Sequence, residues 1–306
     1  MRDGGARRLV RDAAYRLALA TRFPAFRRKR VGAAIFAFHN VVADDESPAR
    51  CDASLHVPLS AFQDYLAVIA DSYRVVPLTE IADRIARRRP VEGLAALTFD
   101  DAYRGVLRHA LPAMSRRGLP ATVFVVSGAA AAPAPFWWDL LGGEDGVPAS
   151  VREPALAELR GDGEAVLRRH PAMEVPMPPA LLPASWHEVR AAARDGITIG
   201  SHTVSHRNLA ALDSQELREE VERSRAEIRA ATGTLPDAIS YPYGMAGDQV
   251  VEAARRGGYT AGVTMRFGLA TRSSDPLALP RINVPAGISV PAFECWAAGL
   301  RLGVAS

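Results

Sequence analysis

The chain has 306 residues, of which 48% are hydrophobic and 23% charged, and its formal net charge is +3. This length fits one large domain or two small ones, and the hydrophobic fraction is sufficient for a sizeable core. A net charge this small argues against a nucleic-acid-binding protein, so we expect no nucleic acid among the partners. Two cysteines, Cys51 and Cys295, are too few for a disulfide scaffold.

Residues 1–30 form a basic segment that we expect to be an appendage to the main domain. Arginines surround apolar residues at helical spacing, which are Leu9, Val10, Ala13, Ala14 and Leu17. Such a helix could rest on an anionic membrane or pack against the outside of the domain. The sequence shows no signal peptide and no membrane span, so we expect a cytoplasmic protein, either free or peripheral to the inner face of the membrane.

From Val31 onward, short apolar runs alternate with helical patterns. The runs that predict strands are Val31–Phe38, Arg74–Val76, Leu94–Phe99, Ala121–Val126, Ile197–Ile199, Ala238–Tyr241, Thr260–Thr264 and Leu279–Val284. Helices are predicted over Ser60–Ala70, Thr79–Arg88, Gly105–Arg117, Ser185–Arg194, Ser214–Ala231, Ala246–Arg256 and after Val290. This alternation is typical of parallel strands with right-handed crossovers, and seven or eight units fit a closed barrel better than an open sheet.

Residues 129–185 interrupt the alternation and are too long for a simple connection. They contain Phe136-Trp137-Trp138-Asp139 and a charged helical pattern near Val151–Arg169. We expect an insertion that forms a lid or a wall of the substrate site. Within it, Trp138 either stacks on a ring of the substrate or fills the core of the insertion.

Polar residues follow several of the predicted strands. His39 follows the first strand, Asp100 and Asp101 follow the strand Leu94–Phe99, His202 follows Ile197–Ile199, and Tyr241 ends the next strand. Catalytic groups of α/β barrels lie at the carboxyl ends of the strands. We therefore expect these side chains to face one mouth of the barrel.

Three of these residues suit a metal ion. His202 and His206 are four residues apart, and a helical turn would put both imidazoles on one face. Asp101 would be the third ligand, which leaves a position open, as a catalytic metal requires. The Asp pair could instead cap the following helix. The ligand set predicts one divalent metal ion, with zinc favoured and cobalt, iron, manganese or nickel as alternatives.

The order of these motifs resembles the polysaccharide deacetylase family, the carbohydrate esterases with a NodB-homology domain. The resemblance covers roughly residues 31–284 and is carried by Thr98-Phe99-Asp100-Asp101, Ser201-His202-Thr203-Val204-Ser205-His206 and Tyr241-Pro242-Tyr243-Gly244. It implies an α/β fold with a distorted (β/α)7-type barrel over residues 31–306. It also implies a metal-dependent hydrolase of linear amide C–N bonds whose substrate is an N-acetylated sugar or glycan.

The resemblance also implies roles for individual residues. Asp101, His202 and His206 would bind the metal, and Asp100 would be the general base that takes a proton from the attacking water. The backbone N–H of Tyr243 would stabilise the oxyanion, and Tyr241 and Pro242 would lie beside the substrate.

The sequence departs from the most familiar family pattern in two places. Ser240 stands where those enzymes have an arginine that steadies the base, and no histidine follows His206 to serve as the late general acid. We expect Arg281 to replace the missing arginine. We expect His39 to be the general acid, since a branch of the family has a Tyr-His-x-Val motif similar to the sequence around His39. The alternative for His39 is a structural histidine bonded to backbone.

Four functions follow from these features. The first is removal of N-acetyl groups from amino sugars of a polysaccharide or glycan precursor. The second is an N-deformylase or deacetylase of a lipid-linked sugar, which the basic N-terminal segment favours. A non-catalytic sugar-binding barrel is disfavoured by the intact Asp and His residues. A non-haem iron oxygenase would use the same ligand types on a β-sandwich-like fold, which the βα alternation disfavours.

Overall fold

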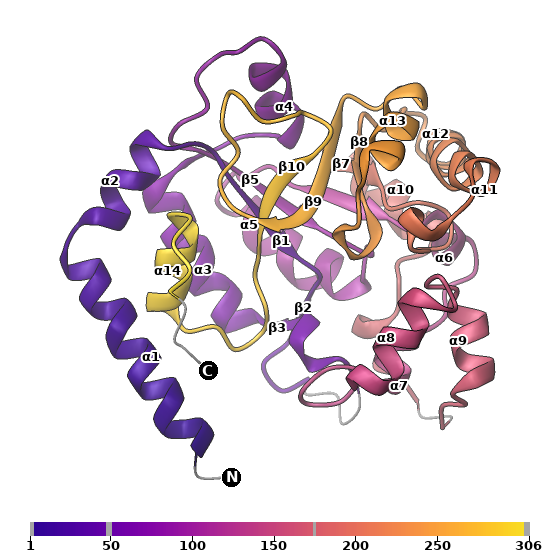
Figure 1. The fold of residues 1–306 in the computed structure, drawn as a ribbon, viewed down its shortest axis with the longest axis horizontal. Coiled ribbons are helices and arrows are strands. Elements are labelled where there is room, and N and C mark those ends of the chain that lie inside the picture. The colour runs from indigo at the N-terminus through magenta and orange to yellow at the C-terminus, as the bar shows by residue number, and fades with distance from the viewer. Residues whose placement is uncertain (1–2, 47–50, 174–175, 303–306) are drawn as a thin grey trace.

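The computed structural model describes residues 3–46, 51–173 and 176–302. In this part of the chain, seven parallel strands close a barrel in the order β1-β10-β9-β8-β7-β6-β5, and β5 pairs back with β1 (Figure 1). They are β1 (Ala34–Phe38), β5 (Leu94–Phe99), β6 (Thr122–Val125), β7 (Thr198–Ser201), β8 (Ala238–Ser240), β9 (Ala261–Phe267) and β10 (Leu279–Asn283). The short strand β4 (Arg74–Val75) pairs with the start of β5. The predicted α/β barrel is confirmed.

The barrel closes unevenly around its circumference. β1 and β5 pair over five residues, whereas β7 and β8 share only the pair Ser201 and Ile239. The register between β9 and β10 shifts between Leu279 and Arg281. All residues of β1 and β5 are buried, as expected for parallel strands that are covered by helices on one side and by the barrel interior on the other.

Helices cover the outside of the barrel near the positions that the sequence predicts. They are α3 (Leu59–Ser72), α4 (Leu78–Ala86), α5 (Leu111–Ser115), α10 (Trp186–Arg194), α11 (Ser214–Arg218), α12 (Ser224–Thr232), α13 (Asp248–Arg256) and α14 (Val290–Ala297). Capping boxes fix two of the starts, because Ser185 pairs with Glu188 and Asp213 pairs with Glu216. π-Helical turns precede α5 over Val106–Ala110 and α12 over Glu219–Arg223.

A second, two-stranded parallel sheet follows the first barrel strand. It consists of β2 (Asn40–Val42) and β3 (His56–Pro58), and the sequence analysis did not predict it. The insertion carries α6 (Ser127–Ala131), α7 (Trp137–Leu141), α8 (Ala149–Ala157) and α9 (Gly163–Arg169). Helix α7 lies on the side of the molecule where β2 and β3 lie (Figure 1). The predicted charged helix is in fact two helices, since Arg160 and Gly161 between them have left-handed backbone angles.

The basic N-terminal segment forms α1 (Asp3–Ala20) and α2 (Phe23–Arg30), beside α14 (Figure 1). Tyr15 is buried there, its hydroxyl accepts a hydrogen bond of 2.9 Å from Trp296 Nε1, and Ser289 Oγ donates to Asp12 Oδ1 at 2.6 Å. One face of α1 therefore packs on the domain. The side chains of Arg7, Arg8 and Leu9, and residues 174–175 of the insertion, lie outside the described residues. Within those ranges, every helix is too short or too polar to cross a membrane.

Candidate metal centre and active site

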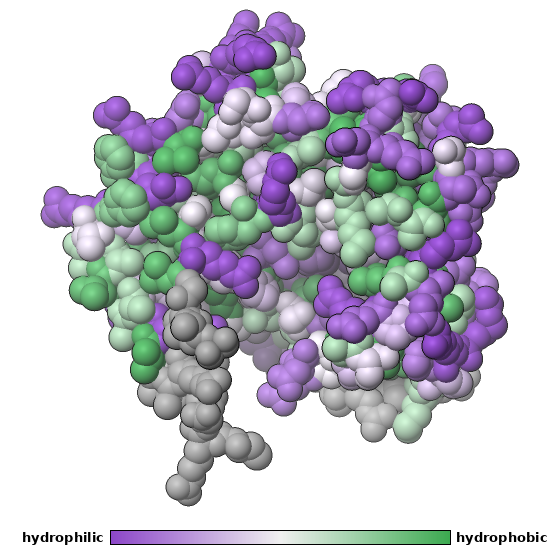
Figure 2. All heavy atoms as spheres, viewed as in Figure 1, coloured by the Kyte–Doolittle hydropathy of each residue, from purple (hydrophilic) through white to green (hydrophobic). Residues whose placement is uncertain are grey.

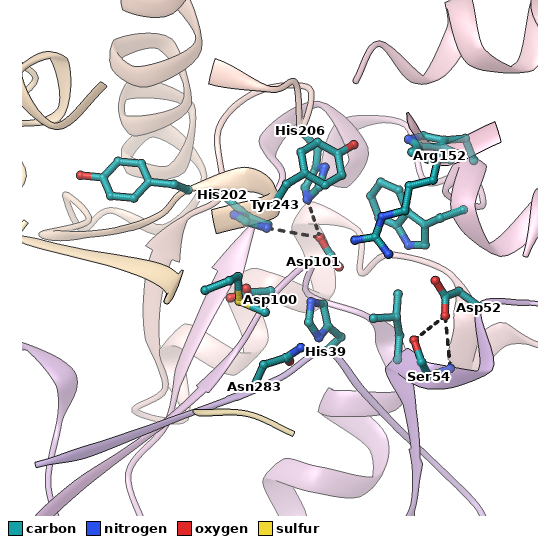
Figure 3. A pocket seen from close by; sticks show the side chains of 15 residues that line it. His39, Asp52, Ser54, Asp100, Asp101, Arg152, His202, His206, Tyr243 and Asn283 are labelled. Carbon is teal, nitrogen blue, oxygen red and sulfur yellow. Dashed lines mark hydrogen bonds and ion pairs between the residues drawn. The ribbon is translucent and has the colours of Figure 1, made fainter. Parts of the chain in front are cut away.

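The carboxyl ends of the barrel strands surround a cavity of about 280 Å³ (Figure 3). His39 follows β1, Asp100 and Asp101 follow β5, and His202 follows β7. The full lining is His39, Asp52, Ser54, Leu55, Asp100, Asp101, Trp137, Trp138, Arg152, His202, His206, Tyr241, Tyr243, Met265 and Asn283. The strand-end residues that the sequence singled out thus come together at one mouth of the barrel.

Asp101, His202 and His206 offer ligand atoms that all lie within 4.8 Å of one another. The Nε2 atoms of His202 and His206 are 3.5 and 3.4 Å from Asp101 Oδ1, which is buried and accepts no hydrogen bond. Burial raises the pKa of Asp101 well above its usual value, and the charges of Asp100 and Asp139 add to this effect. A cation between these three side chains would relieve that cost, so the residues fit a divalent metal ion.

Both imidazoles are held in the neutral form that binds metals. Burial lowers the pKa of His202 and lowers that of His206 well below its usual value. The Nδ1 atom of His202 lies 2.7 Å from the carbonyl oxygen of Ser240, which can only accept a hydrogen bond. Nδ1 therefore carries the proton, and the lone pair of Nε2 faces Asp101.

The segment that carries the two histidines is a loop, so the expected helical turn is wrong. Thr203 and His206 have left-handed φ angles of 65° and 57°. The buried carboxylate of Glu220 accepts hydrogen bonds from the N–H groups of Val204 and Ser205 at 2.8 and 3.0 Å. These bonds satisfy backbone groups that a helix would have paired internally, and the resulting loop still directs both Nε2 atoms at Asp101.

Asp100 is held by Arg281, which lies 181 residues further along the chain. Nη1 and Nη2 of Arg281 donate to Oδ1 and Oδ2 of Asp100 at 2.8 and 2.6 Å. Ser240 Oγ donates to Oδ2 at 3.2 Å, and Thr264 O accepts from Arg281 Nε at 3.0 Å. Burial alone would raise the pKa of Asp100, but the charge and hydrogen bonds of Arg281, with smaller contributions from His202 and His39, together outweigh burial and hold the pKa well below its usual value. Asp100 is therefore ionised.

His39 lies partly buried in the cavity wall, near Asp100 (Figure 3). Burial lowers its pKa to about 4, and Arg281 contributes in the same direction while Asp100 opposes it. The ring has no hydrogen-bond partner among the described residues, which differs from a histidine fixed by backbone bonds. At neutral pH His39 is neutral, so it must receive a proton before it can give one.

The third motif places only one of its residues fully at the cavity. Tyr243 has a left-handed φ of 58°, and its ring stands edge-on to that of His206 with centroids 4.7 Å apart. No described residue accepts a hydrogen bond from its N–H. Tyr241 also lines the cavity, but its hydroxyl donates to Leu277 O at 2.8 Å in the core. Pro242 is buried and is not among the lining residues. The hydroxyl of Tyr241 and the ring of Pro242 are thus not offered to a substrate.

Trp138 is almost fully buried against a metal-ligand candidate. Its ring stacks on Phe136 at 4.5 Å and lies 4.6 Å from the ring of His206. Its Nε1 donates to the hydroxyl of Tyr103 at 2.7 Å. One face of the indole is therefore covered by Phe136, and the residue supports His206 from the side of the insertion.

A buried polar network, absent from the sequence analysis, continues from Trp138. Tyr103 donates its hydroxyl to Asp139 Oδ2 at 2.6 Å, and His56 Nε2 lies 2.9 Å from Asp139 Oδ1. Asn40 donates to His56 Nδ1 at 3.0 Å, so His56 carries its proton on Nε2 and donates to Asp139. The network ties the insertion to β2 and β3. Asp139 is a polar residue that directly follows two tryptophans in the sequence. Its partners Tyr103 and His56 are 36 and 83 residues away, so the local sequence does not predict them.

Other cavity residues also escaped the sequence analysis. Asp52 accepts hydrogen bonds from the N–H and Oγ of Ser54 at 3.2 and 2.5 Å. Arg152, from α8 of the insertion, points toward the cavity (Figure 3) and is the only arginine or lysine in its lining. Asn283 ends β10 beside His39 (Figure 3). None of these belongs to a local motif that would have marked it.

The family model described as Polysaccharide deacetylase matches residues 87–262, which is more than half of the chain. The chain belongs to the polysaccharide deacetylase family. By this membership it is a deacetylase-like hydrolase that acts on amide bonds. A curated relative from Bacillus subtilis (strain 168), YxkH, which is named for the same family, is 24% identical over 250 residues, or 81% of this chain and 72% of the relative.

Solved structures share the fold of this chain. IcaB from Ammonifex degensii superposes with a TM-score of 0.62 at 20% identity and covers 87% of this chain and 97% of its own. The Streptococcus pyogenes deacetylase PplD, in complex with acetate, gives 0.61 at 19% identity over 85% and 95%. At these identities the similarity shows the barrel fold. It agrees with the seven-stranded barrel described above.

Proposed function

We propose that this deacetylase-family chain is a metal-dependent hydrolase that removes N-acetyl groups from amino sugars of a polysaccharide or a glycan precursor. The observation that carries the proposal is the Asp101–His202–His206 triad at the cavity, with the ionised Asp100 beside it. Two neutral imidazoles and a carboxylate, with no fourth protein ligand among the residues that the structure describes, suit a catalytic metal. Family membership supports hydrolysis of an amide.

Zinc is the metal that we propose, since two histidines and one carboxylate are common zinc ligands; cobalt, iron, manganese or nickel accept the same donors. A divalent ion held there would supply a Lewis acid for the acyl carbonyl and would promote ionisation of water.

The side chains can carry the proton steps of the reaction. Water attacks the carbonyl carbon, and Asp100, fixed by Arg281, takes the released proton. The free N–H of Tyr243 can donate to the developing oxyanion. Because the low pKa of Asp100 makes it a weak base, it can readily pass the proton on. The neutral imidazole of His39 can receive that proton and deliver it to nitrogen as the C–N bond breaks. The products are a carboxylate and a free amine.

The second candidate is an N-deformylase or deacetylase of a lipid-linked sugar. The observation that favours it is the outer face of α1 and α2, where Leu17 and Phe26 are exposed together with basic residues such as Arg30. Such a face would bring the enzyme to a substrate that is anchored in a bilayer.

One experiment separates these candidates. Purified protein loaded with defined metals is incubated with N-acetylated and N-formylated amino sugars, each free, polymeric or lipid-linked, and released acetate and formate are measured. Acetate from free or polymeric sugars supports the first function. Release only from the lipid-linked substrate supports the second. Sugar binding without release of either acid, with every metal, would leave a non-catalytic sugar-binding barrel.

A further inference from the structure

Large apolar side chains are exposed together on the N-terminal helices. Val10, Leu17, Phe23 and Phe26 are 63%, 72%, 50% and 58% exposed. In the described part of the chain, the other exposed large hydrophobic residues are Met173, at 66%, and Leu235 and Met245, both at 38%, and they are far apart in sequence. Figure 2 shows apolar and strongly polar residues side by side over α1 and α2, at the left of the view. A cluster of this kind on a single segment marks a contact surface.

This exposed face is distinct from the face of α1 that packs on the domain. Tyr15 is buried beside Cys295 and Trp296 of α14. Val10, Ala13, Leu17 and Ala20, all exposed, follow one another at intervals of three and four residues on the outside of the same helix. Packing on the domain explains only the face of α1 that carries Tyr15. The packed-helix interpretation of α1 therefore accounts for one side of the helix and leaves the exposed side unexplained.

The charge of this segment is strongly positive. Residues 1–30 contain ten arginines and lysines and two aspartates, a net charge of +8, whereas the whole chain has +3 and residues 31–306 therefore have −5. Arg16, Arg22, Lys29 and Arg30 are exposed. The guanidinium of Arg30 lies 5.8 Å from the ring of Phe26, so charged and apolar groups share one surface.

We propose that the exposed face of α1 and α2 docks on the surface of a bilayer that contains anionic lipids. Apolar side chains flanked by cations match the boundary between acyl chains and anionic headgroups. A second copy of this chain would bring two segments of charge +8 together, and a nucleic acid would leave Leu17 and Phe26 without an apolar partner. The proposal does not depend on the proposed function.

Vesicle co-sedimentation of the full chain tests the proposal. We expect binding to vesicles of roughly one part phosphatidylglycerol to three parts phosphatidylcholine, no binding to phosphatidylcholine alone, and weaker binding as salt rises. The double variant Lys29→Glu/Arg30→Glu should bind at least roughly 25-fold more weakly, since each basic residue near the surface contributes about five-fold. The matched control is Arg116→Glu/Arg117→Glu, which reverses two exposed arginines at the end of α5. It should bind like the wild type.

The apolar contribution is tested separately. Leu17→Ser/Phe26→Ser should weaken vesicle binding at every salt concentration, whereas Leu235→Ser, on another exposed apolar residue, should not. Point substitutions are preferable to deletion of the segment, because deletion would uncover α14. The unfolding midpoint of each variant is measured, and Arg16→Glu/Arg22→Glu replaces the first variant if that one unfolds.

Three results would overturn the proposal. One is equal loss of vesicle binding in the α2 and α5 charge variants, since general electrostatics would then explain it. Another is absence of vesicle binding together with a dimer that Leu17→Ser/Phe26→Ser dissociates in sedimentation velocity. The third is salt-dependent binding to RNA or DNA that the α2 variant abolishes, with no binding to anionic vesicles.

Discussion

Arg281 on β10 binds both carboxylate oxygens of Asp100, at 2.8 and 2.6 Å, and neither residue is more than 2% exposed. The next residue, Asp101, has no such partner among the described residues, and its buried Oδ1 accepts no hydrogen bond. The contact with Arg281 helps to lower the pKa of Asp100 against the effect of burial, whereas burial and the charges of Asp100 and Asp139 raise the pKa of Asp101 although the arginine opposes that rise. We infer that Asp100 is held ionised for proton transfer and that Asp101 is left for a cation.

Asp100→Asn should keep the metal and lose activity. The amide cannot accept a proton, and loss of a general base typically costs about 10²–10⁴-fold in rate. The substitution also leaves the buried guanidinium of Arg281 without its counter-charge, so we expect the free energy of unfolding to fall by about 3–5 kcal/mol. Metal content, kcat and urea unfolding are the measurements.

The double variant Asp100→Asn/Arg281→Met separates the two effects. It removes the unpaired charge and should recover much of the stability while staying inactive. A metal-free Asp100→Asn protein would instead identify Asp100 as a ligand, and an active one would place the general base elsewhere.

Replacing Asp101, His202 or His206 by alanine should abolish binding of the metal. Three protein ligands have no redundancy, and loss of one leaves an incomplete site. Wild-type protein at a metal concentration of about 100 times Kd should gain roughly 2.7 kcal/mol in free energy of unfolding, and His206→Ala should gain almost none. His187→Ala, at an exposed helical position, is the control. If His206→Ala shows wild-type metal affinity and metal-induced stabilisation, the triad is not the site.

Most of the barrel was predictable because its strands leave strong local signals. β5 is a run of six buried residues, and the polar Asp100 and Asp101 follow it at once. Parallel barrel strands are covered on both sides, so their apolar runs are continuous and their polar ends stand out. β2 and β3 were missed because strands of three residues are too short to show a period.

The details of the site depended on contacts that no local pattern encodes. The loop of His202 and His206 takes its shape from Glu220, which lies outside the motif. The network of Asp139 joins residues from four separate segments, which contain Asn40, His56, Tyr103 and Asp139. Arg281 was assigned from the absence of an arginine at Ser240 and from its place near the carboxyl side of a predicted strand, whereas its contact with Asp100 spans 181 residues of sequence.

His39→Asn should make the protein less sensitive to acid. Burial lowers the pKa of His39 from 6.5 to about 4 in the folded state. Between these values the unfolded chain binds a proton that the folded chain does not, so wild-type stability falls as the pH decreases through that window. Between pH 7 and about pH 5, the free energy of unfolding should fall by about 2 kcal/mol more in the wild type than in the variant.

Urea unfolding in the presence of a chelator measures this difference. His202 and His206 are present in both proteins, and His187→Asn is the control because that residue is exposed. Equal pH dependence in wild type and His39→Asn would mean that His39 titrates as in water.

Trp138→Leu should weaken metal binding rather than only substrate binding. The indole lies 4.6 Å from the His206 ring and has one face covered by Phe136, so its loss leaves His206 without lateral support. Trp138→Phe keeps a ring but loses the bond to Tyr103 and should have a smaller effect. Metal Kd and substrate KM are measured for both. A higher KM with unchanged metal affinity would favour a sugar-stacking role.

His39→Ala should preserve the fold and the metal content and should lower kcat. Hydrolysis of an amide expels an amine, which leaves poorly unless it is protonated. Of the histidines that the structure describes, His202 and His206 belong to the triad and His56 is bound to Asp139, whereas His39 lines the cavity without a hydrogen-bond partner.

The choice of substrate tests this role directly. An N-acetyl substrate should lose far more rate in His39→Ala than an acetate ester with a good leaving group, which needs little protonation. Because His39 is neutral at neutral pH, the proton that it gives must come from within the site, so the solvent isotope effect on amide hydrolysis should also change in the variant. Equal losses for amide and ester would mean that His39 orients water or substrate. Unchanged rates for both would remove it from the mechanism and leave the proton donor among the other residues of the cavity.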